Sequence, residues 1–280
     1  MSEVPSDYRG SERFSRSPDA SGMACLSDRR PESGHHPMKE IAMTDANVIL
    51  VHGAFADGSS WNDVIERLEA NNVSVKAVVN PLRGVASDAA YVRSVFDQTP
   101  GPVLAVGHSY GGAVVTNAAG NAANVKGLVY VSAFIPDDGE TIQDIAGRSK
   151  DSTLGPALQQ TNYPIGTGPE MAAELTIDPM QYHDVFAGDL PEEQTAIMAA
   201  NQRPLAASSF GEQTMGAAWK RLPSWAVVGS GDHTIGADVV REMAQRAGAK
   251  MVERDASHVV MVSQPDVVTD TIMNALRSLD

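Results

Sequence analysis

Ser109 is the residue of this chain whose type and setting most directly predict chemistry. It lies in the segment Gly-His-Ser-Tyr-Gly at 107–111, directly after a run of four apolar residues and before a second apolar stretch. This pattern is typical of a sharp turn from a buried strand into a helix, which exposes the serine hydroxyl at the carboxyl end of a sheet. We expect Gly107 and Gly111 to be glycine because a Cβ atom would collide there with the neighbouring strand or helix. The segment therefore predicts a nucleophilic serine.

A serine hydroxyl is a weak nucleophile at neutral pH, so it needs a general base, and the base needs an acid that orients it. An apolar strand at 225–229 is followed by Asp232, and a short strand at 250–253 is followed by His258. Serine, acid and histidine in that chain order are typical of one fold. We therefore predict that His258 is the base and that Asp232 orients it.

Four other residues compete for these two roles. Asp255 is close to His258 in sequence but comes at the wrong strand end, and His233 stands beside Asp232, where its side chain should point away. His108 is expected to pack beside the serine. The sequence assigns no role to His183.

Four motifs together resemble those of the α/β-hydrolases of the esterase and hydroxynitrile-lyase-like branch. The resemblance covers about residues 46–280 and rests on Val51-His52-Gly53-Ala54-Phe55, the turn around Ser109, Gly229-Ser230-Gly231-Asp232 and Ser257-His258. It implies the α/β-hydrolase fold, which is a mostly parallel sheet of about six strands flanked by helices, with an inserted helical cap.

The resemblance also implies an oxyanion hole formed by two backbone amides. One belongs to Tyr110, the residue after the nucleophile, and the other to the loop after the first strand. In that loop we choose Ala54, with Phe55 as the alternative. In the resembling family the histidine at the position of His52 supports the loop.

Apolar strands alternate with helices along the rest of the chain, which is typical of a parallel sheet covered on both faces. Strands are expected at 48–51, 73–79, 103–106, 125–132, 225–229 and 250–253, and helices at 61–70, 88–97, 111–119, 238–247 and 265–279. The antiparallel pair that opens many α/β-hydrolases would have to come from the polar N-terminal tail, so we expect it to be missing.

The chain divides into three parts by composition. Residues 1–43 are polar, lack both an apolar period and the apolar region of a secretory signal, and are expected to be disordered. The hydrolase core is predicted at 44–135 and 223–280. The interruption at 136–222 is too long for a plain connection, so we predict a cap insertion there, with a helix from about 190 to 200.

Residues of the cap, together with the oxyanion loop, are candidates for a substrate pocket. The predicted substrate-binding residues are Phe55, Tyr182, Phe186 and Met198, and Met171, Met180 and Phe210 are further candidates. The alternative is that most of the cap residues form a small core of the cap itself.

Composition excludes several classes of partner. The chain has 280 residues, 42 % hydrophobic residues and a formal net charge of −14, which disfavours nucleic acid. No run approaches the roughly 18 apolar residues that span a bilayer, so no membrane partner is expected. The single cysteine, Cys25, excludes an internal disulfide, and no motif indicates a metal site. We expect a soluble, cytoplasmic protein, and nothing in the sequence indicates its oligomeric state.

These observations predict a carboxylesterase-type serine hydrolase. It would cleave a small or medium carboxylic ester, or a lactone, through an acyl-enzyme intermediate, with no cofactor and no metal. Cofactor-free haloperoxidases or perhydrolases share the same triad and remain an alternative. Hydroxynitrile-lyase-like activity is disfavoured, because those enzymes place threonine and lysine where this chain has Gly53 and Val259. A ligand receptor on the same fold is the alternative of a different class.

Overall fold

The structure is a computed structural model that describes residues 46–279. The predictions for the tail at 1–43, which contains Cys25, lie outside the described residues. Within the described part of the chain, no helix is both long and apolar enough to cross a membrane.

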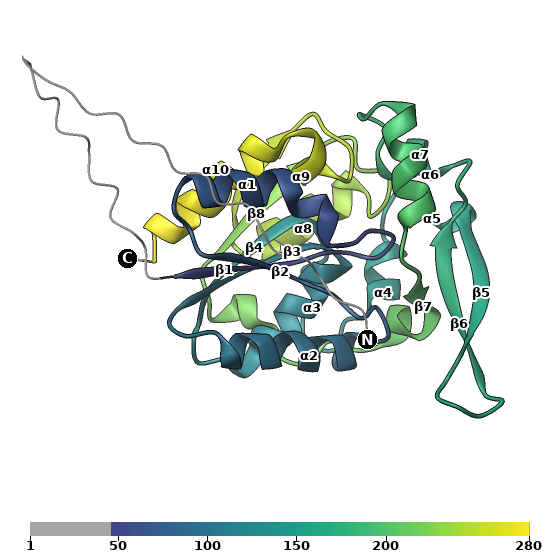
Figure 1. Cartoon of the computed structure of the whole chain (residues 1–280), viewed down its shortest axis with the longest axis horizontal. Helices are drawn as coiled ribbons and strands as arrows, with labels where there is room; N and C mark the ends of the chain where they lie inside the picture. The colour runs from purple at the N-terminus through teal and green to yellow at the C-terminus, as the bar shows by residue number, and fades with distance from the viewer. Residues whose placement is uncertain (1–45, 280) are drawn as a thin grey trace, which may run out of the picture. The chain divides into compact units, whose positions relative to one another are not determined.

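A six-stranded sheet forms the centre of the described chain, in the order β2-β1-β3-β4-β8-β9, with every neighbouring pair parallel (Figure 1). The strands are β1 (Asn47–Val51), β2 (Val75–Val78), β3 (Val103–Ser109), β4 (Val125–Ala133), β8 (Ser224–Gly229) and β9 (Lys250–Arg254). All six were expected from the sequence, and the predicted α/β-hydrolase fold is confirmed.

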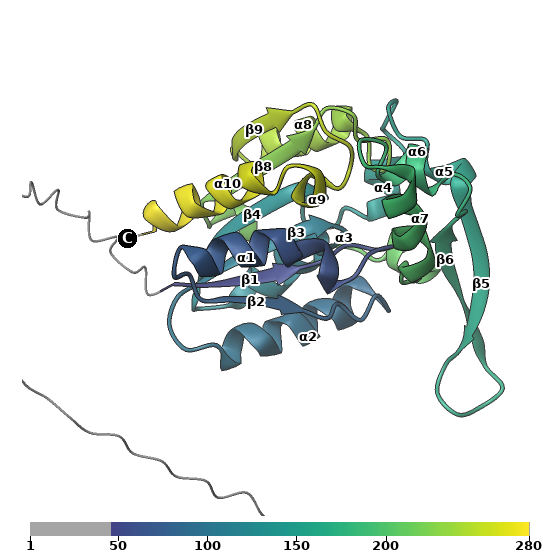
Figure 2. The same cartoon turned by 45° about the horizontal axis from the view of Figure 1, so that its top comes forward.

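Helices cover both faces of this sheet, as expected for a parallel sheet (Figures 1 and 2). On one face, α1 (Asn62–Ala70) packs against α10 (Pro265–Arg277), with the short α9 (Val260–Ser263) beside them. On the other face, α2 (Val85–Gln98) packs against α3 (Tyr110–Ala118). Helix α8 (Ala237–Arg246) packs against β8. Helix α2 begins three residues before its predicted start.

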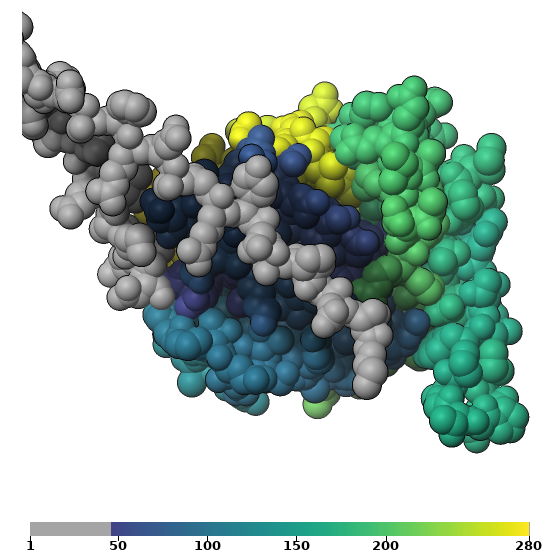
Figure 3. Space-filling model, viewed as in Figure 1, coloured from purple at the N-terminus to yellow at the C-terminus, as the bar shows by residue number. Residues whose placement is uncertain are grey.

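The segment at 136–222, here called the inserted segment, lies between β4 and β8. Its helices are α4 (Ile142–Ala146), α5 (Leu154–Ala157), α6 (Tyr182–Phe186) and α7 (Glu192–Asn201), and its strands are β5 (Leu158–Pro164), β6 (Met171–Ile177) and β7 (Leu205–Ala206). Short 3-10 turns lie at Gly58–Trp61, Ala119–Asn121, Ala207–Gly211 and Ala218–Lys220. Figure 3 shows the inserted segment in green beside the blue surface of α1 and α2.

The three strands of the inserted segment form an antiparallel sheet that the sequence did not predict. The β5–β6 hairpin extends away from the helices (Figure 2). Most of β5 is exposed, so its residues carry no apolar alternation that would indicate a strand. The expected helix at 190–200 is α7, with Pro191 at its N-cap.

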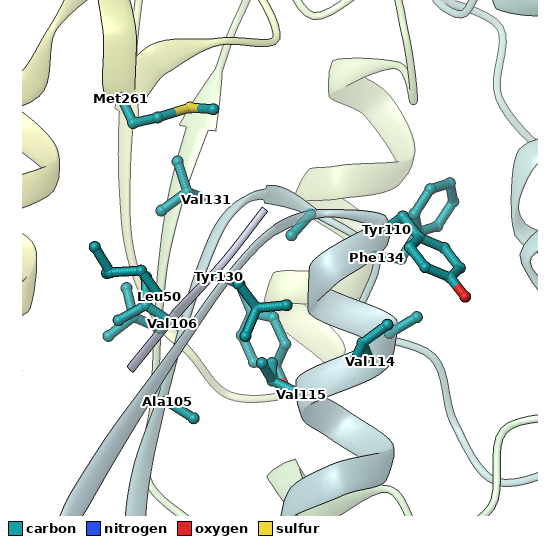
Figure 4. Packing of buried hydrophobic residues seen from close by; sticks show 14 of the residues in the cluster. Leu50, Ala105, Val106, Tyr110, Val114, Val115, Tyr130, Val131, Phe134 and Met261 are labelled. Atoms are coloured by element: carbon teal, nitrogen blue, oxygen red, sulfur yellow. The ribbon is translucent and has the colours of Figure 1, made fainter. Parts of the chain in front are cut away.

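Buried apolar side chains cover both faces of the central sheet. The most completely buried elements are β3 and α3. All seven residues of β3 are buried, and so are eight of the nine residues of α3. Figure 4 shows Tyr130 of β4 beside Val115 of α3, whereas Leu50 and Val106 lie on the other side of the strands. A strand that is buried on both faces reads as a continuous apolar run, which explains why β3 was easy to recognise.

Glycines allow the turn from β3 into α3 to pack closely against the sheet. A Cβ atom on Gly107 would lie 2.6 Å from the carbonyl oxygen of Gly111. A Cβ atom on Gly111 would overlap the carbonyl oxygen of Val51, in the neighbouring strand β1. The expected collisions of a side chain with helix and strand are therefore confirmed.

Replacing Gly111 by Ala should destabilise the protein because two backbones would have to move apart. Overpacking typically costs about 1–3 kcal/mol, and backbone atoms cannot move aside as a side chain can. The measurement is the urea midpoint of unfolding, with Gly168→Ala as the control, since nothing lies within 4 Å of a Cβ atom there. Equal midpoints for the two variants would contradict this account of the turn.

Candidate active site

Ser109 stands at the junction of β3 and α3 in a conformation that few residues other than glycine adopt. Its φ is 53° and its ψ is −124°, and such a backbone costs about 1–3 kcal/mol. The Phe134 amide donates to the Ser109 carbonyl at 3.1 Å, which helps to hold the turn. The serine is 5 % exposed and lines a cavity, so its hydroxyl lies where a small molecule can reach it.

Asp232 and His258 lie on the loops that follow the neighbouring strands β8 and β9, and the structure brings them together. His258 Nδ1 lies 2.8 Å from Asp232 Oδ2, and both side chains are fully buried. The other carboxylate oxygen accepts the amides of Thr234 at 2.9 Å and Ile235 at 3.0 Å. The carboxylate thus has a fixed orientation, and it favours the tautomer of His258 that carries its proton on Nδ1.

That tautomer leaves His258 Nε2 free to accept a proton. Nε2 is buried and has no hydrogen-bond partner among residues 46–279. The ring of Phe186, which is fully buried, lies 5.0 Å from the His258 ring. Apolar packing around one side of the imidazole limits the access of water to it.

The rival acid and histidine lie elsewhere. Asp255 is exposed, and its carbonyl oxygen accepts a hydrogen bond from the side chain of Gln264. His233 is exposed, with Nδ1 3.3 Å from the carbonyl oxygen of Asp151. His183 lies in α6, with Nδ1 3.2 Å from the hydroxyl oxygen of Thr195.

His108, the residue before the serine, is fully buried and supports the backbone of His258. Its Nε2 lies 3.1 Å from the His258 carbonyl oxygen, so Nε2 carries the proton and donates it. Burial, with a smaller contribution from His258, holds the pKa of His108 well below its ordinary value. This imidazole therefore stays neutral.

His52 holds the loop that follows β1. Its Nε2 accepts the amide of Asn80 at 3.0 Å, so Nδ1 carries the proton and donates to the Gly53 carbonyl at 2.8 Å. Burial lowers the pKa of His52 to about 4, and Arg203 acts in the same direction. These contacts match the supporting role expected for the motif histidine.

The loop at 53–55 passes directly over the serine. A Cβ atom on Gly53 would lie 2.6 Å from Ser109 Cβ, so only glycine fits there. The amide of the next residue but one, Phe55, donates to the Arg203 carbonyl at 3.0 Å. Phe55 was the alternative oxyanion donor, and this bond commits its amide elsewhere, which leaves Ala54 as the candidate.

The cavity at Ser109 has a volume of about 270 Å³ and a mostly apolar lining. Ala54, Phe55 and Tyr110 line it beside the serine, and no lining residue carries a charged side chain. Most of the apolar lining comes from beyond β4, and its larger members are Phe134, Ile142, Leu154, Leu158, Leu205, Phe210 and Ile235. The predicted Phe55 and the further candidate Phe210 are thus placed at this cavity.

Three predicted substrate-binding residues, Tyr182, Phe186 and Met198, do not line this cavity, and their role in binding stays a prediction. Tyr182 and Met198 line a separate cavity of about 240 Å³, between α7 and the loop at 56–62. Phe186 is buried among other side chains, with its ring 4.9 Å from that of Tyr182. Met171 and Met180 are exposed, Met180 by 88 %. The alternative that cap residues pack on their own neighbours describes Tyr182 and Phe186 better.

Sequence reasoning missed most of the apolar lining. Phe134 and Ile235 directly follow β4 and the Asp232 turn, so their position after a strand end was a usable signal. Leu158 and Leu205 begin strands that the sequence did not predict, and they gave no comparable signal. Within residues 46–279, no three His, Cys, Asp or Glu side chains gather in a way that could hold a metal ion.

Comparison with known proteins agrees with this geometry. Residues 48–271 match the model of the alpha/beta hydrolase family. The chain is 25 % identical to the probable hydrolase R7 of Phoma sp. over 82 % of this chain and 98 % of that protein. It is 31 % identical to the carbendazim hydrolyzing esterase of Nocardioides sp. over 112 residues, which are 35 % of this chain and 46 % of that protein.

Solved structures share the fold at low identity. The pyrethroid hydrolase of Sphingobium faniae JZ-2 superimposes with a TM-score of 0.67 at 22 % identity, covering 83 % of this chain and 98 % of that one. Polyneuridine aldehyde esterase superimposes with a TM-score of 0.70 at 18 % identity, covering 82 % of this chain and 98 % of that one.

The lowered pKa of His52 makes stability depend on pH. Below its ordinary pKa of 6.5 the unfolded chain takes up a proton that the folded protein does not bind until about pH 4. The free energy of unfolding should therefore fall as pH drops through this window, by about 1.4 kcal/mol per unit from this residue. We expect the stability advantage of wild type over His52→Gln to shrink by about 2 kcal/mol between pH 7 and pH 5.

Urea unfolding of both proteins at several pH values measures this, and the comparison cancels the titrating groups that they share. A difference that stays constant from pH 7 to pH 5 would show that His52 is not held neutral by burial.

Proposed function

Since this chain belongs to the alpha/beta hydrolase family, we propose that it is a carboxylesterase-type serine hydrolase acting through an acyl-enzyme intermediate. The main support is the 2.8 Å contact between buried Asp232 and His258, together with the free His258 Nε2. The His258 ring lies 4.6 Å from the ring of His108, the residue before the strained turn of Ser109. Similarity to proteins named as hydrolases and an esterase is in keeping with an enzyme of this class.

In the first step, His258 Nε2 accepts the proton of the Ser109 hydroxyl while the serine oxygen attacks the carbonyl carbon of the ester. Asp232 keeps the proton on Nδ1 and stabilises the imidazolium that forms. Because the carboxylate already has two backbone donors, it cannot turn away during this step. The product of the attack is a tetrahedral oxyanion bound to the serine.

The amides of Ala54 and Tyr110 are proposed to stabilise that oxyanion. Tyr110 is the first residue of α3, so its amide has no acceptor within the helix, and the helix dipole adds positive potential. The Tyr110 hydroxyl donates to buried Asp88 at 2.8 Å, which fixes the residue from its side chain. Ala54 is held by the loop that His52 supports.

The second step reverses the proton transfers. His258 gives its new proton to the leaving alcohol oxygen as the carbon–oxygen bond breaks, which leaves Ser109 acylated. A water molecule then attacks the acyl carbon and passes a proton to His258 Nε2, which returns it to the serine oxygen when the acid departs.

The lining of the cavity supports a neutral, mainly apolar group on the substrate. Besides Ser109 and Tyr110, three residues with hydroxyl side chains line it, and all three hydroxyls already have partners within the protein. Ser149 donates to Asp238 at 2.8 Å. Ser152 donates to the Thr234 carbonyl at 2.6 Å, and the Thr234 hydroxyl donates to the Val185 carbonyl at 2.7 Å. Burying a charge in this cavity would therefore carry an uncompensated desolvation cost.

The geometry at Gly53 supports ester hydrolysis over hydroxynitrile-lyase activity. The resembling lyases carry threonine at this position, and a side chain here would lie 2.6 Å from Ser109 Cβ. The oxyanion loop of this chain could not accept that residue without moving.

Ser109→Ala should abolish ester hydrolysis in a protein that stays folded. Loss of the nucleophile should reduce turnover of p-nitrophenyl butyrate by about 10³-fold or more. The control is Ser224→Ala, another buried serine, which donates to the Leu222 carbonyl at the start of β8. A fluorophosphonate probe should label wild type at Ser109. Labelling at another serine, or retained activity in the Ser109 variant, would refute the assignment.

Leu158→Lys should change the preference for neutral substrates, because it places a cation in the cavity lining. We expect wild type to prefer p-nitrophenyl butyrate over the succinyl ester, which ends in a carboxylate. The variant should reduce that preference in kcat/KM about tenfold, which corresponds to roughly 1.4 kcal/mol. Gln159→Lys adds the same charge at an exposed neighbour and should leave the ratio unchanged. If the ratio of kcat/KM for the two esters is equal in all three proteins, the acyl group does not bind in this cavity.

A further inference from the structure

Phe55 has a backbone conformation that requires external support. Its φ is 60°, which lies in the left-handed region that bulky residues rarely adopt. The residue is buried and directly follows Ala54, the proposed oxyanion donor. A conformation of this kind persists only where the surroundings hold it, and in proteins it is concentrated at functional sites.

Both polar backbone groups of Phe55 are bound by the inserted segment. The Phe55 amide donates to the Arg203 carbonyl at 3.0 Å. The Phe55 carbonyl accepts the hydroxyl of Tyr182 at 2.9 Å. These two bonds fix the peptide planes on either side of the Phe55 Cα atom, and hence both of its dihedral angles.

The contact with Tyr182 is well shielded from water. The tyrosine is about 1 % exposed, and burial raises its pKa far above the ordinary value, so the hydroxyl remains a donor. The ring of Phe186 packs on Tyr182 at 4.9 Å and on Phe55 at 6.5 Å. A hydrogen bond in such surroundings is stronger than the same bond in water.

We propose that Tyr182 is a positioning residue for the oxyanion hole, an inference that rests on the function proposed above. Its hydroxyl holds the Phe55 carbonyl, and through Phe55 it keeps the Ala54 amide directed at the cavity beside Ser109. Tyr182 itself lines the neighbouring cavity and touches no substrate in this role. The inserted segment thus sets the geometry of a catalytic amide that belongs to the β1 loop.

Loss of this hydroxyl should affect the transition state more than substrate binding. The oxyanion forms only during the reaction, so a misdirected amide lowers kcat and leaves KM nearly unchanged. Removing an oxyanion donor outright costs about 10²–10³ in kcat, so losing its support should cost less. For Tyr182→Phe we expect a fall of roughly tenfold or more in kcat, with KM within about twofold of wild type.

Tyr130→Phe is a matched control, because it also removes one buried tyrosine hydroxyl with one hydrogen bond. The Tyr130 hydroxyl lies 2.9 Å from that of Thr116 in the core, and Tyr130 does not line the cavity at Ser109. Its kcat should match that of wild type. A trifluoromethyl ketone, which forms a tetrahedral oxyanion on the serine, should bind more weakly to Tyr182→Phe in proportion to the loss in kcat. The neutral alcohol 1-butanol, which carries no negative oxygen, should bind equally to all three proteins.

Three results would overturn the role of Tyr182 while leaving the proposed function intact. The first is an unchanged kcat in Tyr182→Phe. The second is a loss of kcat/KM that comes from KM alone, or one that is accompanied by faster cleavage of larger esters. The third is failure of Tyr182→Phe to fold while Tyr130→Phe folds. The second result would show that Tyr182 separates the two cavities. The third would show that Tyr182 is needed for folding rather than for positioning the amide. If wild type cleaves no ester and a fluorophosphonate does not label Ser109, the proposed function itself fails, and this inference fails with it.

Discussion

The close approach of backbones at the start of α3 is the constraint on which the rest of the structure depends. The helix begins against β1 and β3 with no space for side chains at Gly107 and Gly111. The same crowding continues at Gly53, where the β1 loop touches Ser109. Because the nearest atoms at Gly107 and Gly111 belong to the main chain, small side-chain shifts cannot relieve those contacts. They fix where the serine lies relative to the oxyanion loop before any other part of the site is considered.

Parallel pairing of the strands then brings the remaining polar groups to the same edge. Strands β8 and β9 are neighbours, so the loops after them place Asp232 beside His258 although the two residues are far from Ser109 in sequence. The neutral histidines, His52 and His108, use their hydrogen bonds on backbone carbonyls and hold those loops in place. The imidazoles of this site therefore differ in the group that accepts their ring N–H, which is a carboxylate for His258 and a backbone carbonyl for His52 and His108.

The fold and the polar centre could be predicted from sequence because their signals are local. A buried strand followed by glycines around a serine, and polar residues directly after strands, are patterns that a single chain displays. The cavity could not be predicted in the same way. Tyr182 and Phe186 were expected at the cavity, but they pack instead on residues from distant segments: Phe55 lies 127 residues from Tyr182, and His258 lies 72 residues from Phe186. The exposed strand β5 gave no periodic signal, so Leu158 was overlooked.

The inserted segment contributes both apolar walls to the cavity and the hydrogen bonds that hold Phe55. The proposed acyl walls and the proposed anchor of the oxyanion loop consequently belong to one stretch of chain. If that stretch were replaced by the equivalent segment of a relative, the acyl preference would change. The residues that hold the oxyanion loop would change at the same time. A chimera made to alter specificity alone would have to retain Tyr182 and the Arg203 carbonyl while changing Leu158 and Phe210. The exposed residues of β5 beyond Leu158 belong to neither wall nor anchor, so a designer could change them without touching that coupling.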